Sequence, residues 1–247
     1  MDREQYIEVE RTDRSKVYSY QKMLFRYKLS KKFLKPGTVL DVGCGYGFGA
    51  DILNNYQYTS IDYYDKSVQI ASSNYPQASF LHMQAPPINL PTASFNNVVC
   101  TEVIEHMAEE QGKLLLTEMY RVLKPGGIMF LTTPNFDNRE KFLPEHVLEY
   151  GSQHLTQVVN ETGFRITYRG GLCISFLFGR NYPNWFKRWY RKSNSHSTTG
   201  AKRTKASSKK LAVKIGKSGI KTAGNAMIYL GYMFPKKAKY QILVCKK

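Results

Sequence analysis

The residues with the clearest chemical pattern form the run Val39–Gly47, in which Asp41 is followed by glycines at positions 43, 45 and 47. Glycines directly after a strand let the backbone approach a ligand at the carboxyl edge of a sheet. A second acid, Asp62, can accept hydrogen bonds from both hydroxyls of a ribose if it ends the next strand. The run Gly45–Ala50 satisfies the loose form of a dinucleotide fingerprint, but Asp41 would repel a pyrophosphate. The pattern favours an adenosine ligand that carries an ammonium and a sulfonium.

Short apolar runs alternate with helical patterns along most of the chain, which predicts a parallel α/β sheet with helices on both faces. Strands are expected at 38–42, 58–61, 79–83, 97–100, 128–133, 164–168 and 240–245. Helices are expected at 14–35, 50–53, 66–74, 112–123 and 152–161. This order of elements places the glycine run after the first strand and Asp62 at the end of the second.

The charge of the chain is divided unevenly along its length. Residues 1–179 carry 18 basic and 19 acidic side chains, whereas residues 180–247 carry 18 basic and no acidic ones, which gives the total of +17. One globular unit rarely separates charge in this way. We therefore expect the chain to consist of three parts. These are a near-neutral domain over 1–179, a basic, partly helical insertion over 180–238 and a last strand of the domain's sheet over 239–247.

The cysteines and the N-terminal residues indicate the cellular compartment in which the chain is expected. The four cysteines, at positions 44, 100, 173 and 245, form no CxxC pair and have no histidine spacing suited to zinc. We expect neither disulfides nor a metal site, and a reducing cytoplasm is favoured. The N-terminal segment has no apolar signal-peptide region, and no stretch reaches the ~18–20 apolar residues that span a bilayer.

Four longer blocks resemble class I S-adenosylmethionine-dependent methyltransferases of the type-11 domain family. They are VLDVGCGYG at 39–47, SID at 60–62, LPTASFNNVVCTEVIEHM at 90–107 and EMYRVLKPGGIMFLTTPN at 118–135. The resemblance implies a doubly wound, mainly parallel seven-stranded sheet of the Rossmann-like methyltransferase type, whose last strand runs antiparallel. It also implies S-adenosyl-L-methionine as the cofactor.

The resemblance assigns the methionine end of the cofactor to residues around the first and fourth strands. Asp41 and the backbone from Gly43 through Cys44 to Gly45 would hold this end. Thr101 and Glu102 would border it. Arg26 is placed to pair with the cofactor carboxylate, and a solvated helix arginine is the alternative.

The adenosine end is assigned to residues after the second and third strands. Asp62 would bind the ribose hydroxyls, and Tyr63 would pack against adenine. The family usually has an acid after the third strand, where this chain has Gln84, followed by Ala85. The amide oxygen of Gln84 can accept from the adenine amino group without a charge.

Two histidines are candidates for the catalytic step. A sulfonium is already a good leaving group, so alignment for in-line attack supplies much of the rate gain. A hydroxyl acceptor would also gain from a base with a pKa near neutral. His146 lies in a segment that in related sequences faces the acceptor pocket, and a base or a substrate contact is expected there. For His106, packing against a helix is the alternative to a catalytic role.

The basic segment does not by itself identify the methyl acceptor. Aromatic and cationic residues alternate over 181–192, and Lys210, Lys214, Lys217 and Lys221 form one helical stripe beside the apolar run 227–234. Such a segment can lie on an anionic membrane or stack on RNA. We expect O-methylation of a lipid-linked, cell-surface glycan or quinol-type acceptor, with the enzyme at the inner face of the membrane. An RNA methyltransferase and a non-enzymatic binding module are the alternatives, and the oligomeric state is left open.

Overall fold

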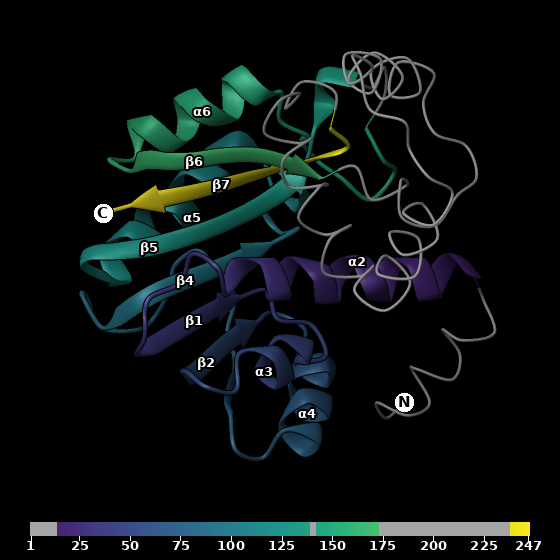
Figure 1. Ribbon diagram of the computed structural model, residues 1–247, viewed down its shortest axis with the longest axis vertical. Coiled ribbons are helices and arrows are strands. Elements are labelled where there is room, and N and C mark those ends of the chain that lie inside the picture. Colours follow the sequence, from purple (N-terminus) through teal and green to yellow (C-terminus); the bar gives the residue numbers. More distant parts are fainter. Residues whose placement is uncertain (1–13, 139–141, 173–237) are drawn as a thin grey trace, which may run out of the picture.

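The computed structural model describes residues 14–138, 142–172 and 238–247 (Figure 1). Within these residues, seven strands form one sheet in the order β3-β2-β1-β4-β5-β7-β6. The strands are β1 (Thr38–Val42), β2 (Gln57–Asp62), β3 (Ser79–His82), β4 (Phe95–Thr101), β5 (Leu123–Pro134), β6 (Arg165–Leu172) and β7 (Tyr240–Lys246). The predicted seven-stranded, doubly wound class is confirmed.

Strand direction brings the strand ends of interest to one edge. Strands β1 to β5 pair in parallel, and β7 runs antiparallel to both β5 and β6, as the family resemblance implies. Asp41 is in register with Ser60 of β2 and with Val99 of β4. Because parallel strands end at a common edge, Val42, Asp62 and Thr101 reach the same side of the sheet.

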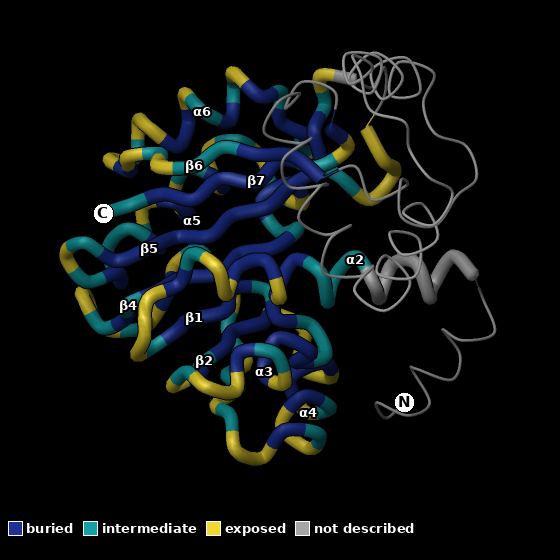
Figure 2. Tube along the Cα trace, viewed as in Figure 1, coloured by how far each residue is buried: buried dark blue, intermediate teal, exposed yellow. Residues whose placement is uncertain are grey.

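Helices cover both faces of the sheet, and the strands between them are buried (Figures 1 and 2). Side chains alternate along a strand, so Leu40 packs in one core with Leu116 and Val158, whereas Val39 packs in a second core with Tyr27. The helices are α2 (Arg14–Ser30), α3 (Phe48–Ile52), α4 (Asp65–Asn74), α5 (Glu109–Val122) and α6 (Ser152–Glu161), with short 3₁₀ turns η1 (Ile104–His106) and η2 (Phe136–Asn138).

Several element boundaries differ from the prediction, most of all the end of α2 and the start of β5. Helix α2 ends at Ser30 rather than at residue 35, because Lys32 and Phe33 donate their backbone N–H groups to carbonyls three residues back and tighten the chain into a turn. Strand β5 begins at Leu123 rather than at residue 128, because Leu123 already pairs with Phe95 of β4. Neither change moves the residues that end β1, β2 and β4.

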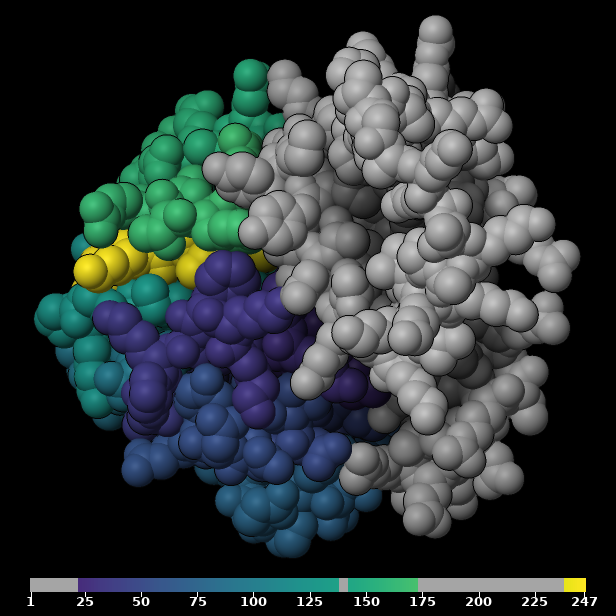
Figure 3. Space-filling view, in the orientation of Figure 1, coloured from purple at the N-terminus to yellow at the C-terminus, as the bar shows by residue number. Residues whose placement is uncertain are grey.

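The last strand lies against the first described helix. In Figure 3 the yellow surface of the C-terminal residues lies between the green surface of β6 and α6 and the purple surface of the N-terminal part. Lys22 Nζ donates to Tyr240 Oη at 3.0 Å, and the Arg26 guanidinium carbon lies 4.5 Å from the centre of the Tyr240 ring. These contacts tie β7 to α2 beside the carboxyl edge of the sheet.

The basic insertion expected over 180–238 lies almost wholly outside the described residues, so its boundaries and its helical stripe stay predictions. Among the helices of the described part, none is both long and apolar enough to span a bilayer.

Candidate active site

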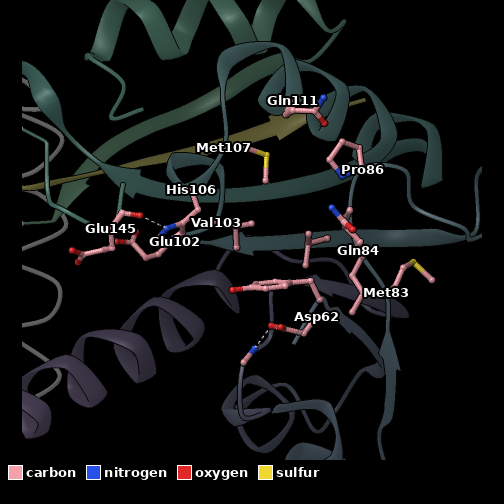
Figure 4. A pocket seen from close by; sticks show the side chains of 16 residues that line it. Asp62, Met83, Gln84, Pro86, Glu102, Val103, His106, Met107, Gln111 and Glu145 are labelled. Atoms are coloured by element: carbon pink, nitrogen blue, oxygen red, sulfur yellow. Dashed lines mark hydrogen bonds between the residues drawn. The ribbon is translucent and has the colours of Figure 1, made fainter. Parts of the chain in front are cut away.

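A pocket of about 700 Å³ opens at the carboxyl edge of β1, β2 and β4. In Figure 4, Glu102, His106 and Glu145 lie at one end of it, and Met83, Gln84 and Pro86 lie at the other. Eight of the residues predicted from the sequence line this pocket: Gly43, Gly45, Asp62, Tyr63, Gln84, Ala85, Glu102 and His106. Five others do not line it: Arg26, Asp41, Cys44, Thr101 and His146.

The glycine turn after β1 presents bare backbone to the pocket. Gly43 and Gly45 have φ angles of 75° and 51°, in the left-handed region that favours glycine. A Cβ on Gly43 would lie 2.3 Å from Val103 Cγ2, whereas a Cβ on Gly45 would meet nothing within 4 Å. The pocket wall at Gly45 is therefore open to a ligand, as the sequence pattern predicts.

Asp62 is fixed in orientation by the backbone around it. Its Oδ2 accepts from the Gly45 N–H at 2.8 Å, and its Oδ1 accepts from the Tyr64 N–H at 2.9 Å. Figure 4 shows the carboxylate at the pocket floor. Each carboxylate oxygen can accept a further bond, so this arrangement fits the two hydroxyls of a ribose. Tyr63 follows it with 75% of its surface exposed, available to cover a base.

Asp41 lies behind the pocket wall rather than in it. Because side chains alternate along β1, Val42 lines the pocket and Asp41 faces α2. Its Oδ2 accepts from Tyr27 Oη at 2.8 Å and from Tyr58 Oη at 2.5 Å, and its Oδ1 has no hydrogen-bond partner. Burial raises the pKa of this carboxyl to about 6. The expected contact with a cofactor ammonium remains a prediction, and the two tyrosines are partners that the sequence did not reveal.

Arg26 and Glu102 form an ion pair at the rim of the pocket. Arg26 Nη2 lies 2.7 Å from Glu102 Oε2, and Thr132 Oγ1 donates to Glu102 Oε1 at 3.0 Å. Glu102 has a φ angle of 57°, which is unusual for a residue other than glycine and is typical of functional sites. A cofactor carboxylate that bound Arg26 would have to share this guanidinium with Glu102.

Cys44 and Thr101 are buried beside the pocket. Cys44 Sγ lies 3.7 Å from the Gly45 carbonyl oxygen, and burial raises the pKa of its thiol well above the usual range. A thiol in this state is not a nucleophile. Neither residue lines the pocket, and their expected place beside the cofactor stays a prediction.

The two candidate histidines lie next to each other although forty residues separate them. The centroids of the His106 and His146 rings are 5.0 Å apart at an interplanar angle of 87°. His106 Nδ1 lies 3.0 Å from the Glu145 carbonyl oxygen, and His146 Nδ1 lies 2.7 Å from Glu149 Oε1. His106 lines the pocket, and His146 lies behind it with its side chain 7% exposed.

Two acids in this corner were not assigned a role from the sequence. Glu105 is completely buried and accepts from Thr133 Oγ1 at 2.9 Å. Glu149 is buried beside His146 and also accepts from the Leu143 N–H at 3.0 Å. The His-x-x-Glu spacing of His146 and Glu149 is a signal that could have indicated this pair.

The sheet order, the glycine turn after β1 and the carboxylate at the end of β2 together define the class I methyltransferase fold. Residues 40–131 match the family model described as "Methyltransferase domain", so this part of the chain is similar to that family. The match spans β1 through most of β5 and so contains the glycine turn, Asp62 and Glu102.

Named relatives are consistent with this match. A protein of Mycolicibacterium smegmatis whose name begins "Probable S-adenosylmethionine-dependent methyltransferase" is 33% identical over 135 residues, which are 52% of this chain and 52% of the relative. A ubiquinone biosynthesis O-methyltransferase of Caulobacter vibrioides is 29% identical over 174 residues, 64% of this chain and 68% of the relative. The chain thus spans about half the length of the mycobacterial relatives that it matches.

Solved structures show the same fold. Phosphoethanolamine N-methyltransferase 2 of Haemonchus contortus, in complex with S-adenosyl-L-methionine, superposes with a TM-score of 0.57 at 18% identity, over 89% of this chain and 52% of that one. An S-adenosylmethionine-dependent methyltransferase of Aquifex aeolicus gives a TM-score of 0.51 at 23% identity, over 59% of this chain and 82% of that one. At these identities the likeness concerns the fold alone.

Proposed function

We propose that this protein transfers the methyl group of S-adenosylmethionine to a hydroxyl oxygen of a lipid-linked or quinol-like acceptor. The observation that carries the proposal is one pocket with two chemically different ends. The glycine turn and Asp62 form an end suited to adenosine, and Glu102 and His106 form an end suited to a polar reacting group.

The adenosine end fits the cofactor residue by residue. Asp62 is oriented for the ribose hydroxyls, the open wall at Gly45 leaves room for the ligand, and Gln84 and Ala85 line the neighbouring wall. When bound, the cofactor supplies an electrophilic methyl group on a sulfonium. The chain then has to align the acceptor oxygen with that methyl group and exclude water.

The acceptor end supports a hydroxyl acceptor with an apolar body. His106 and Glu145 line it, and exposed apolar side chains of the same segment, Phe142, Leu143 and Val147, lie close to His146 in the sequence. Clustered exposed apolar residues often mark a binding surface. The names of several relatives, ubiquinone biosynthesis O-methyltransferases, support an O-methyl product from a quinol-type acceptor.

The membrane part of the proposal rests on the sequence of residues 180–235, all of which lie outside the described residues. Its cations would attract an anionic lipid surface, and its rings would enter the headgroup region. Replacing Trp185 and Trp189 with alanine should release the protein from anionic vesicles even at low salt. RNA binding that falls log-linearly with salt, without vesicle flotation, would favour the RNA alternative instead.

Methyl transfer itself is tested with S-adenosylmethionine labelled in its methyl group. The acceptors are a short-chain polyprenyl quinol, a polyprenyl-phosphate-linked saccharide and an RNA transcript, each with the wild type and with Asp62→Ala. We expect base-stable label, as a methyl ether, in the quinol or the saccharide, and none with the variant. Label in RNA alone, or on nitrogen, would contradict the proposed acceptor.

A further inference from the structure

Three potential metal ligands gather at the acceptor end of the pocket. Glu105 and His106 belong to η1, and His146 follows the gap at residues 139–141. Each offers one ligand atom, and these atoms all lie within 4.8 Å of one another. No other such group of three occurs in the part of the chain that the structure describes. The sequence did not predict it, because the two histidines lie forty residues apart.

Both histidines are held in the manner of metal-binding histidines. His106 Nδ1 lies 3.0 Å from the Glu145 carbonyl oxygen, and His146 Nδ1 lies 2.7 Å from Glu149 Oε1. An acceptor at Nδ1 places the ring proton there and leaves the lone pair on Nε2. Histidines that bind metals almost always donate their other ring N–H to a carboxylate or a carbonyl in this way.

The buried carboxylate of Glu105 has an oxygen without a partner. Glu105 Oε2 accepts from Thr133 Oγ1 at 2.9 Å, but Glu105 Oε1 has no hydrogen-bond partner, and the residue is 0% exposed. A buried acceptor left unpaired is destabilising, and more so when it is charged. A second carboxylate, Glu102, lies three residues earlier and lines the adjacent pocket wall. A cation would satisfy the unpartnered oxygen and offset this concentration of negative charge.

We propose that Glu105, His106 and His146 bind one divalent transition-metal ion, of the Zn²⁺ or Mn²⁺ kind, at the acceptor end of the pocket. Two imidazoles and one carboxylate form a ligand set that catalytic zinc sites use, with a further position left for water or substrate. Metal bonds of about 2.0–2.2 Å would bring the ligand atoms closer together than they are here. His106 is exposed, so its ring can rotate toward the other two ligands.

The role of this ion in catalysis rests on the proposed function. His106 lines the pocket, so an ion bound to it would lie beside the space proposed for the acceptor. A metal-bound hydroxyl has a lowered pKa and releases its proton to water near neutral pH. Its oxygen then forms a bond to the methyl carbon, and the carbon–sulfur bond breaks with its electron pair kept on sulfur, which turns the sulfonium into a thioether. The two histidines act as ligands in this scheme and not as bases.

The test is a calorimetric titration of the full chain with Zn²⁺ and, separately, with Mn²⁺, after removal of metals by a chelator. Variants Glu105→Gln and His146→Gln are compared with His154→Gln, a histidine paired with Glu109 away from this cluster. We expect a site of 1:1 stoichiometry in the wild type and in His154→Gln. Affinity should be at least 30-fold lower in Glu105→Gln and His146→Gln. Thermal unfolding provides a second readout, because the ion should raise the melting temperature of the wild type and not that of these two variants.

Two outcomes would overturn the metal site: no saturable binding by the wild type, or equal binding by Glu105→Gln and His146→Gln. Methyl transfer separates this proposal from the previous one. Transfer that is unaffected by the chelator, in a protein that binds no ion, would remove the metal site and leave the proposed function standing. Site-specific binding of the ion by a protein that does not bind S-adenosylmethionine would remove the proposed function and leave the site.

Discussion

Arg26 Nη2 lies 2.7 Å from Glu102 Oε2, and this ion pair joins the first described helix to the residue that follows β4. The Arg26 side chain is 7% exposed and stacks over the Tyr240 ring, so three segments distant in sequence meet at the pocket rim. Glu102 thereby presents its carboxylate in a fixed place beside the pocket. The pair is a structural brace for the region where the cofactor and the acceptor would meet.

Removing Arg26 should therefore weaken the fold. In Arg26→Met, Glu102 keeps a largely buried charge without its partner, and we expect a loss of about 2–3 kcal/mol in the free energy of unfolding. Chemical denaturation measures it. Arg165→Met, at an exposed position of β6, should change stability by no more than ~0.5 kcal/mol. Equal stability of the two variants would show that the ion pair between Arg26 and Glu102 contributes nothing to the free energy of unfolding.

Two glycines of the same turn should respond differently to alanine. Gly43→Ala would place a Cβ 2.3 Å from Val103 Cγ2 and should lower the melting temperature strongly. Gly45→Ala has open space, so it should fold with only the cost of its positive φ, about 1 kcal/mol. Its Cβ would enter the volume of the ligand, and S-adenosylmethionine affinity should fall at least tenfold. Normal cofactor binding by a folded Gly45→Ala would place the ligand elsewhere.

Asp41 predicts a specific dependence of stability on pH. It faces Tyr27 of α2, Tyr58 of β2 and the Cys44 thiol, with Asp62 as the nearest second carboxylate. Burial raises its pKa from 3.8 to about 6, although the hydrogen bonds from the two tyrosine hydroxyls act to lower it. The native state then keeps a proton that the unfolded chain has released, so stability falls as pH rises from about 4 to about 6 and stays lower above. The full loss is roughly 3 kcal/mol.

Asp41→Asn removes this titration and keeps an oxygen for the tyrosines. The stability of the variant relative to the wild type should therefore improve by up to about 3 kcal/mol between pH 4 and pH 7.5. Urea denaturation of both proteins at the two pH values measures it. A relative stability that is the same at both pH values would contradict the raised pKa.

The pair of His146 and Glu149 predicts an effect on turnover and not on cofactor binding. His146→Ala should lower turnover by ~10²–10⁴-fold, because the residue either accepts a proton or binds the proposed ion. Glu149→Gln, which alters the partner of His146 Nδ1, should lower it by ~10–100-fold. Glu110→Gln, on the exposed side of α5, serves as the control. A less than threefold effect of His146→Ala, with the true acceptor, would make His146 a structural residue.

The sequence predicts well those features that local patterns and parallel strand direction determine. Gly45 and Asp62 could be placed together because Gly45 follows β1 and Asp62 ends β2, and these parallel strands end at one edge. The sequence did not reveal that Asp41 lies behind the pocket wall, since one step along β1 turns a side chain to the opposite face, and its contact with the cofactor stays a prediction. The contact of His106 with His146 and the pairing of Arg26 with Glu102 depend on side chains that meet across separate elements. No local pattern specifies such contacts.

The central claim is tested most directly by the affinity of the purified chain for S-adenosylmethionine, measured by calorimetry for the wild type, Asp62→Asn and Asp65→Asn. Asp65 is an exposed carboxylate in the first turn of α4 and is the matched control. We predict saturable binding by the wild type and by Asp65→Asn, and a loss of about 1.5–3 kcal/mol in Asp62→Asn, the range for hydrogen bonds to a charged group. Equal binding by Asp62→Asn, or tight binding of NAD with no binding of S-adenosylmethionine, would contradict the account.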